Sequence, residues 1–397
     1  MTDAAVPLEP LSREEKSPLV AAAARVGAEV AAAHAARVDR DAAFPRESMQ
    51  ALAGERLLGA LVPRELGGLS ASYTDLSAMC TALGRHCATS AMVFAMHQIQ
   101  VACVVRHGLR EPALRQYAAE ALAGRQELLA SATTELGVGG DVRTSICTVE
   151  REGEQFRLEK NAPVISYADS ADGILATARR APEAPQADQV ICVLKKADYT
   201  LERTSTWDTL GFRGTCSNGY LLKARADVRQ IIPQPYAEVS AQTMLPVSHI
   251  VWSSLWLGIA LDAFERARAF VRAEARKKPG QMPPGALRLA ELGTVVQGFR
   301  ANVNEAVAAF EAAQGDPDAL SSMGLALRWN NLKVQSSQLV LQIVQQALLI
   351  CGIAGYKNDS KFSLTRQLRD AYGAMLMINN DRILGANASM LLIHKGE

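Results

Sequence analysis

The sequence lacks cysteine pairs and closely spaced metal ligands. Its 397 residues include seven cysteines, an odd number, and no two of them form a C-x-x-C motif. This spacing argues against a disulfide framework and against a zinc site, and it is typical of proteins from a reducing compartment. We therefore expect a cytoplasmic protein with buried thiols and no bound metal.

The sequence also lacks an excess of either charge. It has 42 lysines and arginines against 41 aspartates and glutamates, which gives a formal net charge of +1. Nucleic-acid-binding domains carry a basic patch, so we expect no nucleic-acid partner. The first residues show no basic-then-apolar signal segment. The most apolar early run, residues 20–36, is interrupted by Arg25, Glu29 and His34, and we expect no membrane span there.

Aromatic residues are scarce at 5%, whereas apolar residues make up 49% of the chain. A chain of this size and composition can bury a large core, and its abundant alanine and leucine favour helices. The patterns run from helical to strand-prone and back to helical, which predicts an α+β fold. We divide the chain into a leader (1–16), an N-terminal helical domain (17–130), a central β-domain (131–240) and a C-terminal helical bundle (241–397).

The central domain is predicted from short β-prone runs that turn residues separate. A set of this size is enough for a small β-barrel or sandwich. The runs are residues 144–151, 156–160, 173–179, 189–195, 199–203 and 217–228.

The C-terminal region is predicted to form a four-helix bundle. Its broad apolar faces also suggest self-association. We expect breaks in the last helix at Gly373 and Gly385. The four helices are expected at residues 250–276, 287–314, 320–352 and 363–392.

Residues 131–141, Ser-Ala-Thr-Thr-Glu-Leu-Gly-Val-Gly-Gly-Asp, stand where the first helical region gives way to the strands. The three glycines permit positive φ and let a ligand approach the backbone. The hydroxyls of Thr133 and Thr134 add donors beside exposed N–H groups. Such a loop suits the flat polar edge of a ligand or a phosphate, although many turns of this composition only reverse the chain.

Seven motifs occur in an order that resembles the acyl-CoA dehydrogenase family over residues 37–388, nearly the whole chain. The resemblance implies N-terminal helices, a β-domain and a four-helix bundle, with FAD as the cofactor. It implies α,β-dehydrogenation of an acyl thioester carried by CoA or by acyl carrier protein. It also implies an electron-transfer flavoprotein or another acceptor, and a homodimer or homotetramer. The motifs are Phe44–Glu47, Val62–Gly68, Thr134–Asp141, Ile165-Ser166 with Ala171-Asp172, Leu210–Thr215, Cys351–Tyr356 and Arg369–Ala371.

The same resemblance implies a set of cofactor-binding residues. Thr134 matches the threonine that hydrogen-bonds the pyrimidine edge of the flavin, and Ser166 matches a residue at the N5 side. Arg276 matches the arginine that reaches the FAD pyrophosphate of a neighbouring subunit, a task that suits a guanidinium fork. The full set is Thr133, Thr134, Gly139, Gly140, Ser166, Arg276, Gly352 and Gly355.

The chain departs from the family pattern at several positions of this site. Gly140 stands where a serine is usual, and Val164 stands where many members have a tryptophan beside the ring. Near the adenosine end, Leu349 replaces a glutamine and Ile353 replaces a glycine. The resemblance therefore describes the ring end of the cofactor site more closely than the dinucleotide end.

A further departure concerns the catalytic base. Family dehydrogenases use a glutamate to remove the α-proton of the thioester, because carbon acids are weak and need a positioned carboxylate. The position that matches this glutamate is Ile378, and the alternative family position is Ser248-His249. Neither position holds a glutamate.

Three residues are candidates for the missing role. Asp381 lies one helical turn beyond Ile378 on the same face, and the alternative is an exposed or capping aspartate. His97 lies in an apolar helix, where an imidazole either satisfies the core or supports flavin–oxygen chemistry and proton transfer. His249 opens the long helix at the second base position, and the alternative is a helix residue at a subunit contact.

Three functions follow from these features. The leading hypothesis is an FAD-dependent acyl-thioester dehydrogenase with Asp381 as the base. The second is a flavin-dependent monooxygenase of the same fold, a group that also lacks the glutamate and in which His97 would have a role. The third is a catalytically inactive member that acts as a binding subunit.

Overall fold

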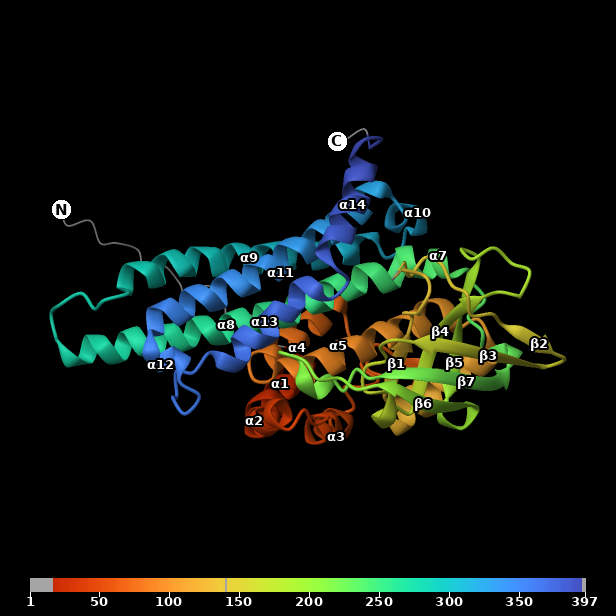
Figure 1. The fold of residues 1–397 in the computed structure, drawn as a ribbon, viewed down its shortest axis with the longest axis horizontal. Coiled ribbons are helices and arrows are strands. Elements are labelled where there is room, and N and C mark those ends of the chain that lie inside the picture. Colours follow the sequence, from red (N-terminus) through yellow and green to blue (C-terminus); the bar gives the residue numbers. More distant parts are fainter. Residues whose placement is uncertain (1–16, 140, 395–397) are drawn as a thin grey trace, which may run out of the picture.

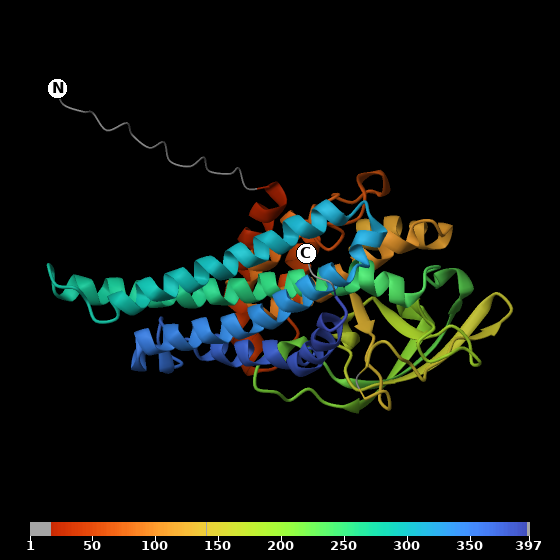
Figure 2. The same cartoon turned by 90° about the horizontal axis from the view of Figure 1, so that it is seen from above.

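The computed structural model describes residues 17–139 and 141–394. An N-terminal group of helices lies against a layer of long C-terminal helices, and two β-sheets lie at one end of that layer (Figure 1). Figure 2 shows the long helices running side by side, with the sheets again at one end. The described residues thus follow the predicted order of helices, strands and helices.

The N-terminal region packs short helices around a nearly completely buried α5 (Ala88–Cys103). A capping box starts α4, in which the Ser72 side chain and the Asp75 side chain each accept a backbone N–H of the other residue; this satisfies two N–H groups that a helix start leaves free. The other helices are α1 (Pro18–Arg25), α2 (Ala32–Arg40), α3 (Arg46–Gly54), α4 (Tyr73–Gly84) and α6 (Pro112–Tyr117).

The strands form two sheets in the described chain. One has the order β1-β4-β5 and pairs β1 and β4 in parallel; the other has the order β2-β3-β7-β6 and is antiparallel. Five of the β-prone runs correspond to strands within a few residues, whereas the run 144–151 overlaps β2 only at Glu150 and Arg151, and β1 was not predicted. The strands are β1 (Leu129–Ala132), β2 (Glu150–Glu152), β3 (Gln155–Ala162), β4 (Gly173–Arg179), β5 (Gln189–Lys195), β6 (Tyr199–Ser205) and β7 (Gly219–Asp227).

The C-terminal bundle is built around α8, which contacts the N-terminal helices α4 and α5 as well as α9 and α11. Close approach of α4 and α8 requires glycine on both helices. A Cβ added at Gly258 would lie 2.4 Å from the Thr81 oxygen, and one added at Gly84 would lie 2.4 Å from the Leu255 oxygen. The helices are α7 (Tyr236–Val239), α8 (Leu245–Lys277), α9 (Ala286–Ala313), α10 (Pro317–Leu320), α11 (Met323–Cys351), α12 (Ile353–Tyr356), α13 (Thr365–Leu376) and α14 (Asn380–Leu391).

The predicted fourth long helix is interrupted, but at residues 377–379 and not at either predicted glycine. Gly373 lies within α13, and its missing side chain makes room for Phe212, whose Cδ2 would lie 2.9 Å from an added Cβ. Gly385 also lies within a helix, α14. The actual break contains Ile378 at φ 47°, a left-handed conformation that a β-branched side chain rarely adopts.

Four helices of the described chain are long and apolar enough to cross a membrane by length and composition alone, including Pro18–Arg40, which we did not expect to qualify. Two of them use their apolar surface inside the fold. The apolar windows of Ala88–Gly108 and Tyr236–Lys277 are 89% and 94% buried, so these helices form the core of the molecule.

Candidate functional site

The site begins at the turn that follows β1, which we call the Thr134 turn (residues 133–139). Gly137 and Gly139 adopt φ values of 95° and 60°, which the missing Cβ permits. Two hydrogen bonds join the turn to the strand region after it. The Leu136 N–H donates to the Asn161 carbonyl at 2.9 Å, and the Thr134 hydroxyl donates to the Val164 carbonyl at 3.0 Å.

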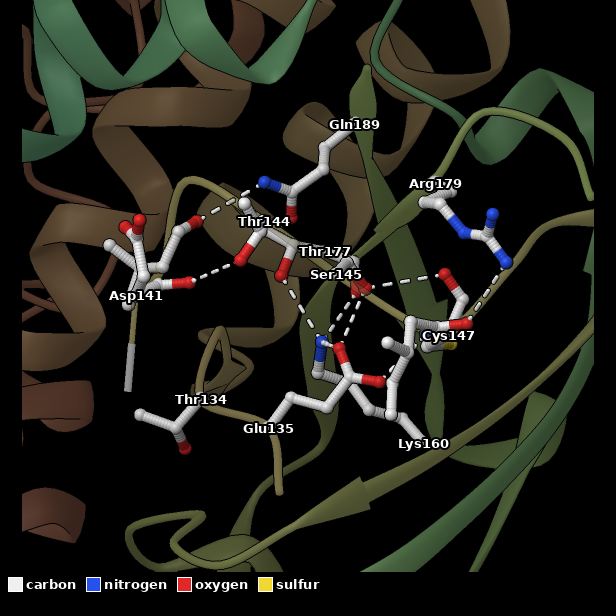
Figure 3. A network of polar contacts seen from close by, with 12 residues as sticks. Thr134, Glu135, Asp141, Thr144, Ser145, Cys147, Lys160, Thr177, Arg179 and Gln189 are labelled. Atoms are coloured by element: carbon white, nitrogen blue, oxygen red, sulfur yellow. Dashed lines mark hydrogen bonds and ion pairs between the residues drawn. The ribbon is translucent and has the colours of Figure 1, made fainter. Parts of the chain in front are cut away.

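The Thr134 turn contributes Glu135 to a buried ion pair with Lys160 (Figure 3). The Lys160 ammonium is 3.1 Å from Glu135 Oε2, and both side chains are almost completely shielded from solvent. The Glu135 carboxylate also accepts hydrogen bonds from the Ser145 hydroxyl (2.6 Å) and the Cys147 N–H (2.7 Å). Lys160 donates to the Thr177 carbonyl at 2.8 Å. A buried charge pair is tolerated when its remaining donors and acceptors are satisfied in this way.

The backbone N–H groups of Thr133 and Thr134 are candidates for binding the polar edge of a flavin ring. Thr133 and Thr134 are only partly buried. In the described part of the chain, their backbone N–H groups donate no hydrogen bond outside the strand ladder. Such exposed backbone donors can bind the carbonyl and nitrogen acceptors of a flat heterocycle. The donor set is therefore suited to a flavin.

Ser166 adds a hydroxyl on the neighbouring segment. Its Oγ is 2.8 Å from the Ser217 Oγ, which in turn is 2.8 Å from the Thr215 Oγ1. Since Thr215 donates to the Phe212 carbonyl, this hydroxyl chain connects two of the sequence motifs, Ile165-Ser166 and Leu210–Thr215. Thr134 reaches the same segment through Val164, two residues before Ser166, so the ring-end residues lie together.

The start of α14 closes the site from the bundle side. The Arg382 guanidinium donates to the Gly139 carbonyl at 2.6 Å. Asp141, just beyond the turn, pairs with Arg143, and the hydrogen bond from Arg143 lowers the pKa of Asp141. Asp381 is exposed on the first turn of α14, and its N–H donates to the Asn379 side chain at 3.0 Å. Contact between Arg382 and Gly139 therefore brings the Asp381 segment to the edge of the Thr134 turn.

Comparison with known families now adds to this geometry. The model of the acyl-CoA dehydrogenase N-terminal domain matches residues 13–124, and that of the acyl-CoA dehydrogenase C-terminal domain matches residues 239–377. Together they cover more than half of the chain. The chain belongs to the acyl-CoA dehydrogenase family. This family consists of flavoproteins, in agreement with the donor set around Thr134.

Individual relatives of this acyl-CoA dehydrogenase family member differ in chemistry. Cyclohex-1-ene-1-carbonyl-CoA dehydrogenase of Geobacter metallireducens is 23% identical over 86% of this chain and 88% of its own length. The amino sugar nitrososynthase DnmZ of Streptomyces peucetius is 25% identical over 84% and 82%. FMN-bound TdsC of Paenibacillus sp. A11-2, a dibenzothiophene monooxygenase, has the same fold with a TM-score of 0.83 at 18% identity, over 96% and 98% of the two chains.

Ile378, the residue that the sequence pattern matched to the family glutamate, lies in the turn between α13 and α14, and 45% of its surface is exposed. An isoleucine cannot accept a proton. The fully buried Lys333 of α11 lies beside this turn and donates to the Asn380 Oδ1 at 2.7 Å and to the Ile378 carbonyl at 3.4 Å. Burial lowers the pKa of Lys333 to about 8.

His97 is placed as a structural residue. Its ring is fully buried; Nδ1 accepts the Leu129 N–H at 2.9 Å, and Nε2 lies 2.9 Å from the Leu58 carbonyl, to which it donates. Burial lowers the pKa of His97 to about 4, so the ring stays neutral near pH 7. Because both nitrogens are engaged with the backbone, the geometry favours the core alternative. The catalytic role of His97 stays a prediction without geometric support.

His249 is similarly enclosed at the start of α8. Its Nδ1 donates to the Trp329 carbonyl of α11 at 2.9 Å, and burial lowers its pKa to about 3. This contact joins two bundle helices within one chain. The geometry favours a structural role for His249, and a catalytic role stays a prediction.

The predicted dinucleotide-binding residues lie apart from the Thr134 turn. Gly352 precedes α12, at the end of the bundle away from the sheets (Figure 1), and Gly355 lies within α12. Arg276 is exposed in the last turn of α8, at the same end. One chain therefore cannot bring these residues to its own Thr134 turn, and the prediction that they bind FAD requires a second subunit. Gly140 lies outside the described residues.

Sequence reasoning missed Lys160, Arg382 and Lys333. Lys160 had a signal: β3 alternates exposed and buried residues, and this lysine stands at an inward position, where an unpaired charge is costly. Arg382 and Lys333 act through contacts with residues more than forty positions away, which no local pattern reveals. Among the described residues, no group of three or more metal-ligating side chains is brought together.

Proposed function

We propose that this chain is a flavin-dependent oxidoreductase that removes hydrogen from the α and β carbons of an acyl thioester. Bound FAD supplies the acceptor for the β-hydride. The Thr134 turn and Ser166 hold the ring edge, and the Asp381 carboxylate takes the α-proton. The carrier is CoA or acyl carrier protein, the electron acceptor is an electron-transfer flavoprotein or an equivalent carrier, and the working form is a cytoplasmic homodimer or homotetramer.

The contact between Arg382 and Gly139 carries this proposal. It fixes the first turn of α14 against the Thr134 turn, and Asp381 is the carboxylate on that turn. Proton abstraction from a carbon acid needs a carboxylate held within hydrogen-bond reach of the proton. The break at residues 377–379 separates Asp381 from Ile378, so the two do not lie one turn apart on one helix as expected from the sequence. Asp381 still meets this need if the substrate lies between its carboxylate and the ring edge. The acyl-CoA substrate in the name of the Geobacter relative supports the same substrate class.

The buried ion pair and the exposed Asp381 have different physical roles in this proposal. The buried pair of Glu135 and Lys160 keeps the Thr134 turn rigid, so that its N–H groups are already oriented before the ligand binds. Donors held in this way stabilise negative charge without reorganising. Asp381 is exposed and carries no ion pair in the described chain, which leaves its oxygens free to accept a proton.

A second candidate is oxygen chemistry on a reduced flavin. It is favoured by Ile378, which leaves the family's base position without a carboxylate, and by the nitrososynthase relative. A hydroxylating enzyme of this fold needs no α-proton acceptor. This candidate predicts that no acyl thioester reduces the bound flavin.

The experiment that separates the two candidates is an anaerobic absorbance titration of the FAD-loaded protein with butyryl-, octanoyl-, isobutyryl- and cyclohexanecarbonyl-CoA. Loss of the flavin band with one thioester supports dehydrogenation. A flavin that no thioester bleaches, but that consumes O₂ when an external reductase supplies reduced FAD or FMN, supports oxygen chemistry. A protein that binds neither flavin would contradict both and favour a non-catalytic subunit.

A further inference from the structure

Lys333 is a buried cation with no carboxylate partner in the described chain. Its side chain is fully shielded in α11, and its polar contacts are the Asn380 Oδ1 at 2.7 Å and the Ile378 carbonyl at 3.4 Å. Burying an ammonium without a countercharge is costly. A leucine or methionine would fill a bundle interior without that cost, so the lysine has a role that simple packing does not explain.

Both acceptors of Lys333 belong to the turn between α13 and α14. Ile378 adopts φ 47°, a strained conformation for a β-branched residue that persists only where the surroundings hold it. The two acceptors lie on either side of Asn379, the residue that caps α14 through the Asp381 N–H. The ammonium therefore ties both ends of the strained turn to one point on α11.

A neighbouring serine orients Asn380 toward the lysine. The Ser337 hydroxyl donates its proton to the Val334 carbonyl at 2.7 Å, so its oxygen is free to accept from Asn380 Nδ2 at 3.0 Å. With Nδ2 engaged in this way, Oδ1 points at Lys333. Lys333, Ser337 and Asn380 therefore form a cluster with one consistent set of donors and acceptors.

This cluster includes Asn380, the residue directly before the proposed base, Asp381. From Asn380 the chain continues directly into Asp381 and then Arg382, which reaches the Gly139 carbonyl. A change in the turn would move the Asp381 carboxylate relative to the Thr134 turn. A displacement of about 1 Å in a catalytic group can lower a rate by about 100-fold.

We propose that Lys333 is a positioning residue for Asp381, acting through the turn formed by Ile378, Asn379 and Asn380. This inference rests on the proposed function, because it needs Asp381 to act on substrate. Lys333 itself is too deeply buried to touch the substrate. Its contribution is to hold the turn in the one conformation that aims α14 at the flavin-binding turn.

A purely structural role makes a different prediction. Replacing a buried charge by an apolar side chain of similar volume is often neutral or stabilising. A lysine that served only the bundle could be changed to methionine with no specific effect on proton abstraction. The test must therefore measure proton abstraction separately from folding and flavin binding.

The test uses α-proton exchange of butyryl-CoA in D₂O with the FAD-loaded full-length protein, followed by mass spectrometry. Lys333→Met should lower the exchange rate by roughly 10- to 100-fold at unchanged flavin occupancy. Asn380→Asp, which keeps an oxygen facing Nζ, should retain most of the exchange. Lys160→Met is the matched control among buried lysines, because it should lower flavin occupancy instead.

Asn380→Leu provides a second route if Lys333→Met does not fold. Asn380→Leu should lower the α-proton exchange rate as Lys333→Met does. The variant with both changes should exchange no more slowly than either single variant, since the two residues act as a unit. If wild type exchanges and both single variants exchange equally fast at equal flavin occupancy, the positioning role is wrong while the proposed function stands. If wild type itself shows no exchange with butyryl-CoA or the other thioesters, the proposed function fails and this inference fails with it.

Discussion

The Lys160 ammonium lies 3.1 Å from the carboxylate of Glu135, a residue of the Thr134 turn, and both side chains are shielded from solvent. Three residues from two separate segments complete its hydrogen bonds: Ser145 and Cys147 from one segment, and Thr177 from β4. The pair therefore ties the glycine-containing Thr134 turn to the strands β3 and β4.

Lys160→Met should destabilise the protein and weaken its affinity for FAD. The change leaves Glu135 as a buried carboxylate without its cation, which costs about 3–5 kcal/mol. Thermal unfolding and a fluorescence titration with FAD measure the two effects. The control is the double variant Lys160→Met with Glu135→Gln, which should recover part of the loss because no charge stays buried alone. Equal unfolding temperature and FAD affinity in wild type and Lys160→Met would show that the pair does not hold the turn.

The buried carboxylate of Asp370 should make stability fall as pH rises from about 4 to 6. It accepts the Phe212 N–H at 2.7 Å, and burial raises its pKa to about 6. Between the unfolded pKa of 3.8 and this value, the folded state binds more protons than the unfolded state, so folding weakens with increasing pH. Asp370→Asn keeps an acceptor oxygen but cannot titrate. Denaturant unfolding across this pH range should therefore show that Asp370→Asn becomes more stable relative to wild type as pH rises. A difference in unfolding free energy that stays constant with pH would contradict the raised pKa of Asp370.

His97 should have the opposite effect on acid stability. Its pKa is lowered to about 4 by burial, whereas the unfolded value is 6.5, so the unfolded state takes up a proton first as pH falls. Stability that is present above pH 6.5 is then lost toward pH 4, on the order of 3 kcal/mol in total. Urea unfolding of wild type and His97→Gln should be compared at pH 7 and pH 4.5. The difference between their unfolding free energies should be smaller at pH 4.5. A stability difference of equal size at both pH values would mean that His97 is not held neutral.

Gly211→Ala should be strongly destabilising. An added Cβ would lie 2.2 Å from the Arg369 carbonyl oxygen, a backbone atom that cannot move without shifting α13. We expect a loss of at least about 2 kcal/mol, comparable to other overpacked sites. The matched control is Gly298→Ala on the exposed face of α9, where an added Cβ meets nothing within 4 Å and helix propensity predicts a gain of about 0.5–1 kcal/mol. Similar unfolding curves for the two variants would contradict the packing of Gly211 against α13.

The fold was largely predictable because its signals are local. The strand Gln155–Ala162 alternates exposed and buried residues, and the glycine at position 211 belongs to a motif whose partner, Arg369–Ala371, is another motif of the same family pattern. Strand β1 was missed because Leu129–Ala132 is only four residues long and almost entirely buried. A short apolar run of this kind has no period that separates it from a helix.

The candidate site was only partly predictable because its contacts are not local. Thr134 and Ser166 could be found from their motifs, whereas the pairing of Glu135 with Lys160 joins positions 25 residues apart. The helix break at Ile378 could not be foreseen, since isoleucine seldom adopts positive φ. Lys333, more than forty residues earlier, hydrogen-bonds this turn, a contact that no local pattern reveals.

The most direct test of the account is an anaerobic stopped-flow measurement of flavin absorbance in FAD-loaded wild type and Asp381→Asn, each mixed with the acyl-CoA that best bleaches wild type. Asparagine keeps the size of the side chain but cannot accept the α-proton, so the account predicts rapid loss of the flavin band in wild type and a rate lower by roughly 100-fold or more in the variant. Bleaching at the same rate in both proteins would contradict Asp381 as the base.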